Sequence, residues 1–144
     1  MRPVLLLSAA VLAGHVTLAS AQKPAPAKKS GIQLSDVAGT WDSKTMLGPK
    51  DSVVVTSVLT ATADGKGWTL KLANRDPIPV RVVAVGGDSV VTEAGPYESI
   101  VRPGQMVTTH SVGHYKGDAM TGTVEARYAS GDVLRGKTTA TRRK

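Results

Sequence analysis

Apolar and polar residues alternate with a period of two from Val37 almost to the end of the chain, with clusters of Gly, Asp, Asn and Pro between the alternating runs. Such alternation is typical of β-strands that bury one face, and no window of about eleven residues has the spacing of an amphipathic helix. The pattern predicts strands at residues 40–46, 52–62, 67–72, 78–85, 89–93, 98–101, 105–115, 119–128 and 133–141. The two short pieces beside Pro96 can be read as one interrupted strand, which gives eight strands.

The connections between these strands are short and contain Gly or Asp where a turn needs a positive φ angle. They lie at residues 63–67, 86–88, 116–118 and 130–132. Loops of this length join neighbouring antiparallel strands, whereas a parallel crossover needs a dozen residues or more. The sequence therefore predicts an antiparallel meander.

An open meander of this length would leave two exposed edges, so we expect an all-β fold that closes into a small up-and-down barrel. A sandwich of two packed sheets is the alternative. Alternation places one set of residues inside: Val53, Val55, Leu59, Trp68, Leu70, Leu72, Ile78, Val80, Val82, Ala84, Met120, Val124 and Tyr128. It places the other set toward solvent: Thr69, Lys71, Arg81, Thr121, Thr123, Glu125 and Arg127.

The chain begins with the pattern of a secretory signal peptide over residues 1–21. Arg2 supplies a positive start, residues 4–18 are mostly apolar, and Ala19-Ser20-Ala21 is a small-x-small cleavage site. Residues 22–31 are a Pro/Ala/Lys-rich linker with little to bury, and residues 32–144 form a single domain. The sequence therefore predicts an exported protein, periplasmic or extracellular, without stable membrane insertion after cleavage.

Composition and charge narrow the range of partners. The chain has no cysteine, so disulfides and thiolate metal sites are excluded, and it has no Phe. Seven of the 18 basic residues lie in the signal, the linker and the last three positions, which leaves eleven against the eleven acidic residues. With a neutral body and few aromatic residues, no nucleic-acid partner is expected.

The first predicted strand carries a short family resemblance. The sequence Leu34-Ser35-Asp36-Val37-Ala38-Gly39-Thr40-Trp41 resembles the opening signature of the lipocalins and related calycins, a turn of helix followed by Gly-x-Trp. The resemblance implies an eight-stranded barrel whose Trp closes one end beneath a basic side chain from the last strand. Gly39 and Trp41 match the signature, and Arg142 or Arg135 is the candidate partner. A second lipocalin signature is missing, and the domain is short for a roomy cavity.

The two histidines after the signal lie four residues apart on one predicted strand. At about 3.3 Å per residue, His110 and His114 are about 13 Å apart and cannot chelate one metal together unless the strand breaks at Gly113. A metal site would need carboxylates from other strands, such as Glu125, and none is predicted.

Catalytic motifs are also missing from the sequence. There is no Gly-x-Ser-x-Gly elbow, Walker loop or dinucleotide fingerprint, and Asp88, Glu93 and Glu98 fall at turn positions. We therefore predict neither catalytic residues nor a cofactor. A small barrel enzyme would require a polar cluster inside the barrel near His110 or Glu125.

A short apolar segment between two Pro-marked turns offers a candidate barrel rim. Tyr97 contributes a ring and a hydroxyl, Ile100 an apolar side chain, and His110 a polar group from the following strand. The sequence favours a lipocalin-like protein that binds a small apolar or amphipathic ligand without catalysis. The alternative is a structural or interaction module of the cell envelope whose barrel is filled by its own side chains.

Overall fold

The computed structural model describes residues 31–144, and within them the alternating segments form eight strands after one short helix. The elements are α1 (Leu34–Val37), β1 (Gly39–Leu47), β2 (Ser52–Ala61), β3 (Thr69–Leu72), β4 (Ile78–Gly86), β5 (Ser89–Glu98), β6 (Met106–Lys116), β7 (Ala119–Tyr128) and β8 (Val133–Arg142). The strand positions predicted from alternation are therefore confirmed to within a few residues.

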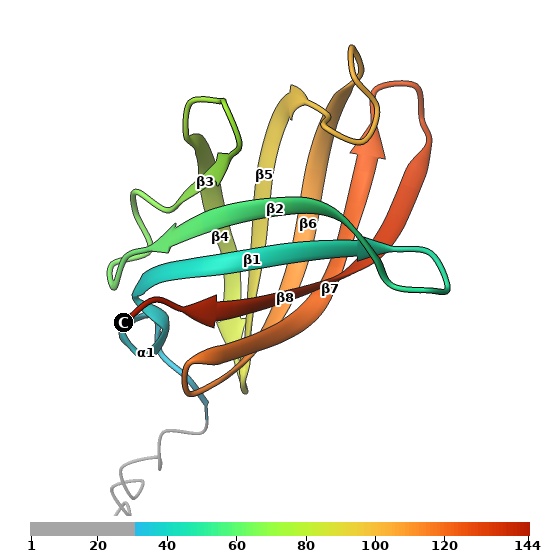
Figure 1. The fold of residues 1–144 in the computed structure, drawn as a ribbon. Helices are drawn as coiled ribbons and strands as arrows, with labels where there is room; N and C mark the ends of the chain where they lie inside the picture. Colours follow the sequence, from blue (N-terminus) through green and yellow to red (C-terminus); the bar gives the residue numbers. More distant parts are fainter. Residues whose placement is uncertain (1–30) are drawn as a thin grey trace, which may run out of the picture.

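Each strand pairs in antiparallel fashion with the next, and β8 pairs with β1 to close the barrel. In this last pairing Trp41 lies opposite Arg142 and Met46 lies opposite Lys137. Because the first and last strands are hydrogen-bonded to each other, the sheet has no terminal edges. This closure confirms the predicted barrel and excludes the sandwich of two sheets. Figure 1 shows the strands following one another around the barrel.

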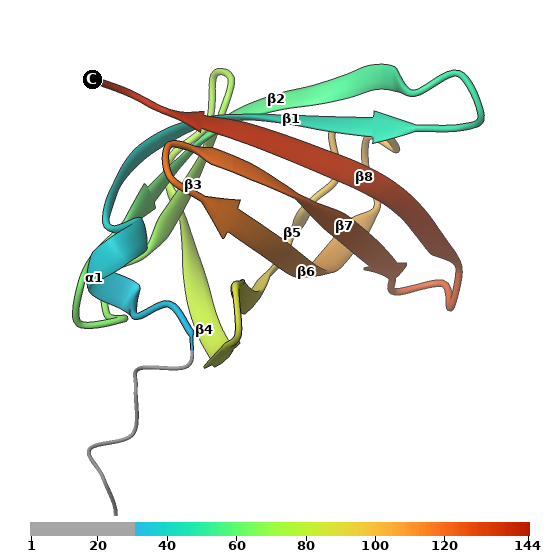
Figure 2. The same cartoon turned by 90° about the horizontal axis from the view of Figure 1, so that it is seen from below.

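The two ends of the barrel differ in what covers them. At one end, here called the closed end, α1 lies beside the two-residue β4–β5 and β6–β7 turns (Figure 1). Gly117 in the second turn has φ +60°, a conformation that favours glycine. The opposite end, called the open end, carries the β1–β2, β3–β4, β5–β6 and β7–β8 loops. Figure 2 shows α1 and the C-terminal end of β8 on the same side of the molecule.

The apolar core gathers at the closed end. Trp41 is 0% exposed, and its ring meets Tyr115 edge-on at a centroid distance of 5.1 Å. Its indole Nε1 donates a hydrogen bond to the Val37 carbonyl at 2.9 Å, which ties α1 to the barrel. Trp68 is similarly buried and donates to the Thr62 carbonyl. Two tryptophans with satisfied N–H groups thus supply the bulk that the missing phenylalanines would otherwise give.

Most of the residues predicted to face inward do so, and two do not. Val53 is 51% exposed, and Ala84 is exposed as well. The pairing of β1 with β2 shifts register next to Val54, and the pairing of β4 with β5 shifts between Val82 and Ala84. A β-bulge adds one residue to a strand and reverses the alternation beyond it. The prediction for Val53 and Ala84 is wrong for this reason.

The strand around Pro96 is continuous, as the eight-strand reading requires. β5 runs through Pro96, and its pairing with β6 shifts register between Ala94 and Tyr97. The predicted strand at residues 98–101 is wrong beyond Glu98. There the Ser99 hydroxyl accepts a hydrogen bond from the Arg102 N–H at 3.0 Å, and the Ser99 N–H donates to the Gln105 carbonyl. These bonds turn the chain into the β5–β6 loop.

The pairing of β3 with β4 is the shortest in the barrel formed by residues 31–144. The register joins Thr69 to Pro79 and Leu70 to Ile78, and the Val80 N–H donates to the Trp68 carbonyl at 2.9 Å. By contrast, the pairing of β6 with β7 runs without interruption from Val107 opposite Tyr128 to Lys116 opposite Ala119. We call the junction of β3 and β4 the seam.

The predicted signal peptide, residues 1–21, and residues 22–30 of the predicted linker lie outside the described residues. Gly31, the last residue of that predicted linker, forms an isolated parallel bridge with Gly87. Within residues 31–144 no helix has the length and apolar character needed to cross a membrane.

Candidate functional site

The barrel encloses a cavity that extends from the closed-end core toward the open end. Its volume is about 130 Å³. Met120 and Tyr115 form its floor, whereas Val101, which is 39% exposed, and Ile100 line it at the open end. A cavity of roughly this size lined by apolar side chains is sufficient for a molecule such as benzene. It is smaller than the pockets of about 300–1,000 Å³ that hold drug-sized ligands.

The cavity wall is neutral. None of the described residues that line it is an Asp, Glu, Lys, Arg or His. Its polar members carry hydroxyl groups: Ser43, Thr45, Ser57, Thr92, Tyr97, Ser99, Thr109, Ser111, Tyr115, Tyr128 and Thr138. The remainder is mostly Val, Leu, Ile, Ala and Met. The wall therefore combines apolar surface with groups that both donate and accept hydrogen bonds.

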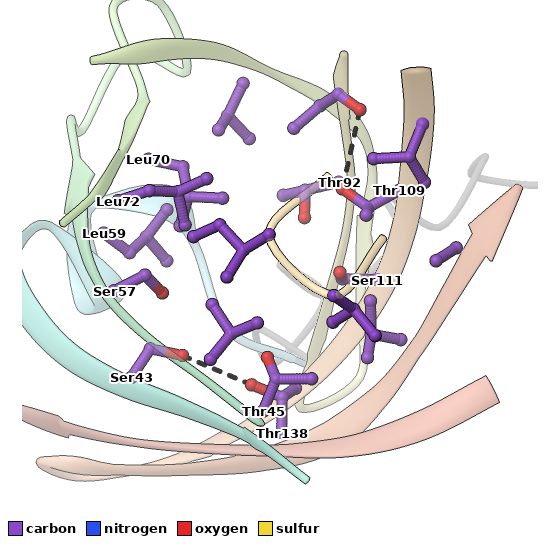
Figure 3. Close-up of a pocket in the computed structure, with 18 of the residues that line it drawn as sticks. Ser43, Thr45, Ser57, Leu59, Leu70, Leu72, Thr92, Thr109, Ser111 and Thr138 are labelled. Carbon is purple, nitrogen blue, oxygen red and sulfur yellow. Dashed lines mark hydrogen bonds between the residues drawn. The ribbon is translucent and has the colours of Figure 1, made fainter. Parts of the chain in front are cut away.

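One group of hydroxyls comes from β1, β2 and β8. Ser43 lies opposite Ser57 in the β1–β2 register, and Thr45 lies opposite Thr138 in the β1–β8 register. The Ser43 and Thr138 hydroxyls are hydrogen-bonded at 3.2 Å, as the lower dashed line in Figure 3 shows. We call Ser43, Thr45, Ser57 and Thr138 the first hydroxyl wall.

A second group comes from β5 and β6, across the cavity from the first (Figure 3). Thr92 and Ser111 are direct partners in the β5–β6 register. Thr109 lies two residues before Ser111 on β6 and therefore faces the same side of the strand. The Thr109 hydroxyl donates to the Ala94 carbonyl at 3.5 Å, a long hydrogen bond. We call Thr92, Thr109 and Ser111 the second hydroxyl wall.

Two of the three residues predicted at the rim line this cavity. Tyr97 and Ile100 both contribute to its wall toward the open end. Burial raises the pKa of the Tyr97 hydroxyl, an effect only partly opposed by its hydrogen bond with Thr109. Burial also raises the pKa of Tyr115 at the floor to about 12. Both tyrosines therefore remain uncharged at neutral pH.

His110, the third predicted rim residue, lies on the outer face of β6, and its assignment to the rim is wrong. The inward residues of this part of β6 are Thr109 and Ser111, and successive side chains of a strand point to opposite faces. The His110 Nδ1 lies 3.2 Å from a Glu93 carboxylate oxygen, outside the barrel. Thr, Ser and His occupy both faces of this strand, so polarity alone did not reveal the orientation.

The residues predicted to close the barrel meet at the closed end. The Arg142 guanidinium carbon lies 4.7 Å from the centroid of the Trp41 ring, in cation–π contact. Arg142 also donates hydrogen bonds to the carbonyls of Ala38 and Asp36, at 2.9 Å and 2.6 Å. Arg142 thereby joins β8 to the segment that precedes β1. The other candidate, Arg135, lies elsewhere and pairs with Glu125.

Gly39 is positioned directly under this arginine. It has φ +137°, and a Cβ atom there would lie 3.5 Å from the Arg142 Cδ. The backbone conformation, rather than a lack of space, therefore favours glycine at this point. It brings the chain from α1 into β1 so that Trp41 enters the barrel.

The acidic residues considered for catalysis lie outside the cavity. Hydrogen bonds from histidine hold the carboxyl pKa below its usual range at both Asp88, bonded to His114, and Glu93, bonded to His110. Arg127 has the same effect on the pKa of Glu125. The carboxylate of Glu98 accepts the Gly104 N–H at 3.0 Å. No cluster among residues 31–144 brings together three His, Asp or Glu side chains in a metal-binding arrangement.

Comparison with known proteins finds no matching family, no matching characterised protein and no matching solved structure. The site must therefore be interpreted from its own geometry.

Proposed function

We propose that this protein binds one small, largely apolar molecule inside its barrel and does not transform it chemically. The observation that carries the proposal is the neutral cavity between the tryptophan-packed floor and the open end. Removing apolar surface from water is favourable by about 25 cal/mol per Å², so a preformed apolar wall binds such molecules without specialised chemistry.

The arrangement of polar groups supports binding over catalysis. A nucleophilic hydroxyl needs a general base within hydrogen-bond reach. His110 and His114 instead pair with Glu93 and Asp88 on the outer surface. The enzyme alternative required a polar cluster inside the barrel near His110 or Glu125. The polar groups there, Thr109 and Ser111, are hydroxyls, and the described lining offers them no His, Asp or Glu as a base.

We further propose that the binding takes place after export to the periplasm or the extracellular space. Support comes from the signal-peptide pattern of residues 1–21, which the sequence shows and which lies outside the described residues. A soluble carrier in such a compartment would make apolar molecules available in water.

The test is an amide NMR titration of residues 22–144 with toluene, whose ring matches the size of the cavity. We expect saturable shifts at cavity residues such as Val107 and Val124. Ala126→Phe should abolish them, because Ala126 lines the cavity and the ring would fill it. The control is Thr123→Phe on the exposed face of the same strand, which should bind like the unmodified chain.

Circular dichroism establishes that each variant is folded before its titration is interpreted. A folded, unmodified protein whose spectrum does not change at millimolar toluene would overturn the proposal. The barrel interior would then have no space for a ligand. The alternative function, a structural or interaction module of the cell envelope, would then be favoured.

A further inference from the structure

Polar groups without partners stand on both walls of the cavity. The Thr45 and Ser57 hydroxyls on the first wall make no hydrogen bond with any other described residue, and the same holds for Thr92 and Ser111 on the second. These four side chains face the same space, as Figure 3 shows for the labelled residues. Within that space, only water or a ligand is available to bond with them.

The region between the two walls is apolar. Leu59, Leu70 and Leu72 come from β2 and β3 and occupy one side of the cavity in Figure 3. Val124 and Met120 of β7 complete the apolar lining toward the floor. The cavity thus has hydrogen-bonding groups on two opposing sides and hydrocarbon between them.

The lining also lacks the means to hold an ion. A buried carboxylate needs a cation or several N–H donors, and a buried ammonium needs a carboxylate, because desolvation of an unpaired ion is costly. The two guanidiniums that stack on aromatic rings of the described barrel are both engaged. Arg142 stacks on Trp41 and is bonded to backbone carbonyls, and Arg102 stacks on Tyr128 and pairs with Asp132. The tyrosines of the wall add no charge at neutral pH, and burial raises the pKa of Tyr97 and Tyr115 further.

We infer that the ligand is a compact, uncharged molecule with hydrogen-bonding groups at two opposite ends and an apolar middle. This inference rests on the proposed function, since it specifies what the same cavity holds. An uncharged ligand would distinguish this protein from carriers that bind fatty-acid anions or organic cations. A hydroxyl group can both donate and accept a hydrogen bond, so a carbonyl, amide or alcohol of the ligand can bond to either wall.

The first part of the test compares two test compounds of almost identical shape. 4-Hydroxybenzamide is neutral and has polar groups at both ends, whereas 4-hydroxybenzoate carries a carboxylate in place of the amide. Both are titrated by NMR at neutral pH into residues 22–144, beside toluene. We expect the amide to bind at least about tenfold more tightly than the carboxylate, because nothing in the wall compensates the charge.

The second part removes the unpartnered hydroxyls wall by wall. Thr45→Val with Ser57→Ala removes the two unpartnered hydroxyls of the first wall, and Thr92→Val with Ser111→Ala removes those of the second. Each double variant should weaken 4-hydroxybenzamide by about fivefold or more, the value of one neutral hydrogen bond, and leave toluene binding equal or tighter. Thr56→Val, an exposed neighbour on β2, is the matched control and should change neither.

The outcomes separate the two proposals. No toluene binding by the folded protein defeats the proposed function itself. Toluene binding together with equal affinity for the amide and the carboxylate overturns the inference that the ligand is uncharged. Amide binding that neither double variant weakens shows that the hydroxyls hold only water, and overturns the assignment of two polar ends.

Discussion

Trp41 and Arg142 form the contact on which the closed end depends. The indole is fully buried, bonded to the Val37 carbonyl and covered by the guanidinium at 4.7 Å. The same guanidinium reaches Ala38 and Asp36, so two side chains connect β1, β8 and the α1 segment. The Gly-x-Trp resemblance to lipocalins implies this type of contact, and the structure places Arg142 over the Trp41 ring.

Replacement of Trp41 by alanine should reduce the free energy of unfolding by about 3–5 kcal/mol, as truncations of buried aromatic side chains do. Urea denaturation followed by circular dichroism measures this change. Val83→Ala is the control, since Val83 is 54% exposed and its truncation should cost no more than about 0.5 kcal/mol. Equal stability of the Trp41 variant and the control would show that the closed end does not depend on this side chain.

At the scale of single elements, close approach of two strands decides where glycine is required. Gly122 of β7 lies opposite Gly113 of β6, and a Cβ atom at residue 122 would lie 2.0 Å from the Val112 carbonyl oxygen. No side chain fits there unless the two strands separate. Gly86 at the end of β4 has no atom within 4 Å of such a Cβ atom.

Gly122→Ala should therefore destabilise the protein by about 1–3 kcal/mol through overpacking. Gly86→Ala provides the comparison and should be neutral or stabilising by up to about 1 kcal/mol, because alanine restricts the unfolded chain. Thermal and urea unfolding of the two variants measure the difference. A Gly122 variant as stable as the Gly86 variant would mean that β6 and β7 separate at little cost.

The elements also show which features the sequence could and could not predict. Alternation and turn residues predicted the order, number and ends of the strands, because each is a local property. The bulges beside Val54 and Val82 were not predictable, because both fall in uninterrupted runs of apolar residues, where a reversal of the alternation leaves no mark in the sequence. Val53, Ala84 and the orientation of His110 were misassigned as a result of such ambiguity in strand faces.

The cavity was the part least accessible to prediction. Tyr97 and Ile100 were placed in it from the Pro-marked turns around them. Ser57, Thr92 and Ser111 were missed because an inward hydroxyl is indistinguishable in the sequence from the outward threonines that are common on solvent faces. The sequence of β6 does contain a clue, because Val107, Ser111 and Tyr115 are separated by even numbers of residues and so lie on the same face of the strand. Which face of the strand points inward is known only once the strands are paired.

At the scale of the whole molecule, the barrel is unevenly closed. Long ladders join β4 through β8 and onward to β1 and β2, whereas the seam between β3 and β4 consists of a few pairings near Leu70 and Ile78. Pro79, within this seam, has no N–H to donate. Local opening should therefore begin here, since few backbone hydrogen bonds have to break.

Hydrogen exchange measured by NMR should show this order directly. The amides of Leu70 and Val80, at the seam, are expected to exchange well before those of Val112 and Thr123 in the β6–β7 ladder. Exchange of all four amides at one common rate would instead indicate that the barrel opens only by global unfolding.

The two ends of the described chain leave the barrel on the same side. Gly31 bridges the β4–β5 turn at Gly87, and Arg142 reaches the Gly117 carbonyl in the β6–β7 turn. Figure 1 shows the C-terminus beside α1, away from the loops of the open end. A tether attached at either terminus, whether a fused domain, an affinity tag or a solid support, would therefore hold the barrel by its base and leave its mouth facing outward.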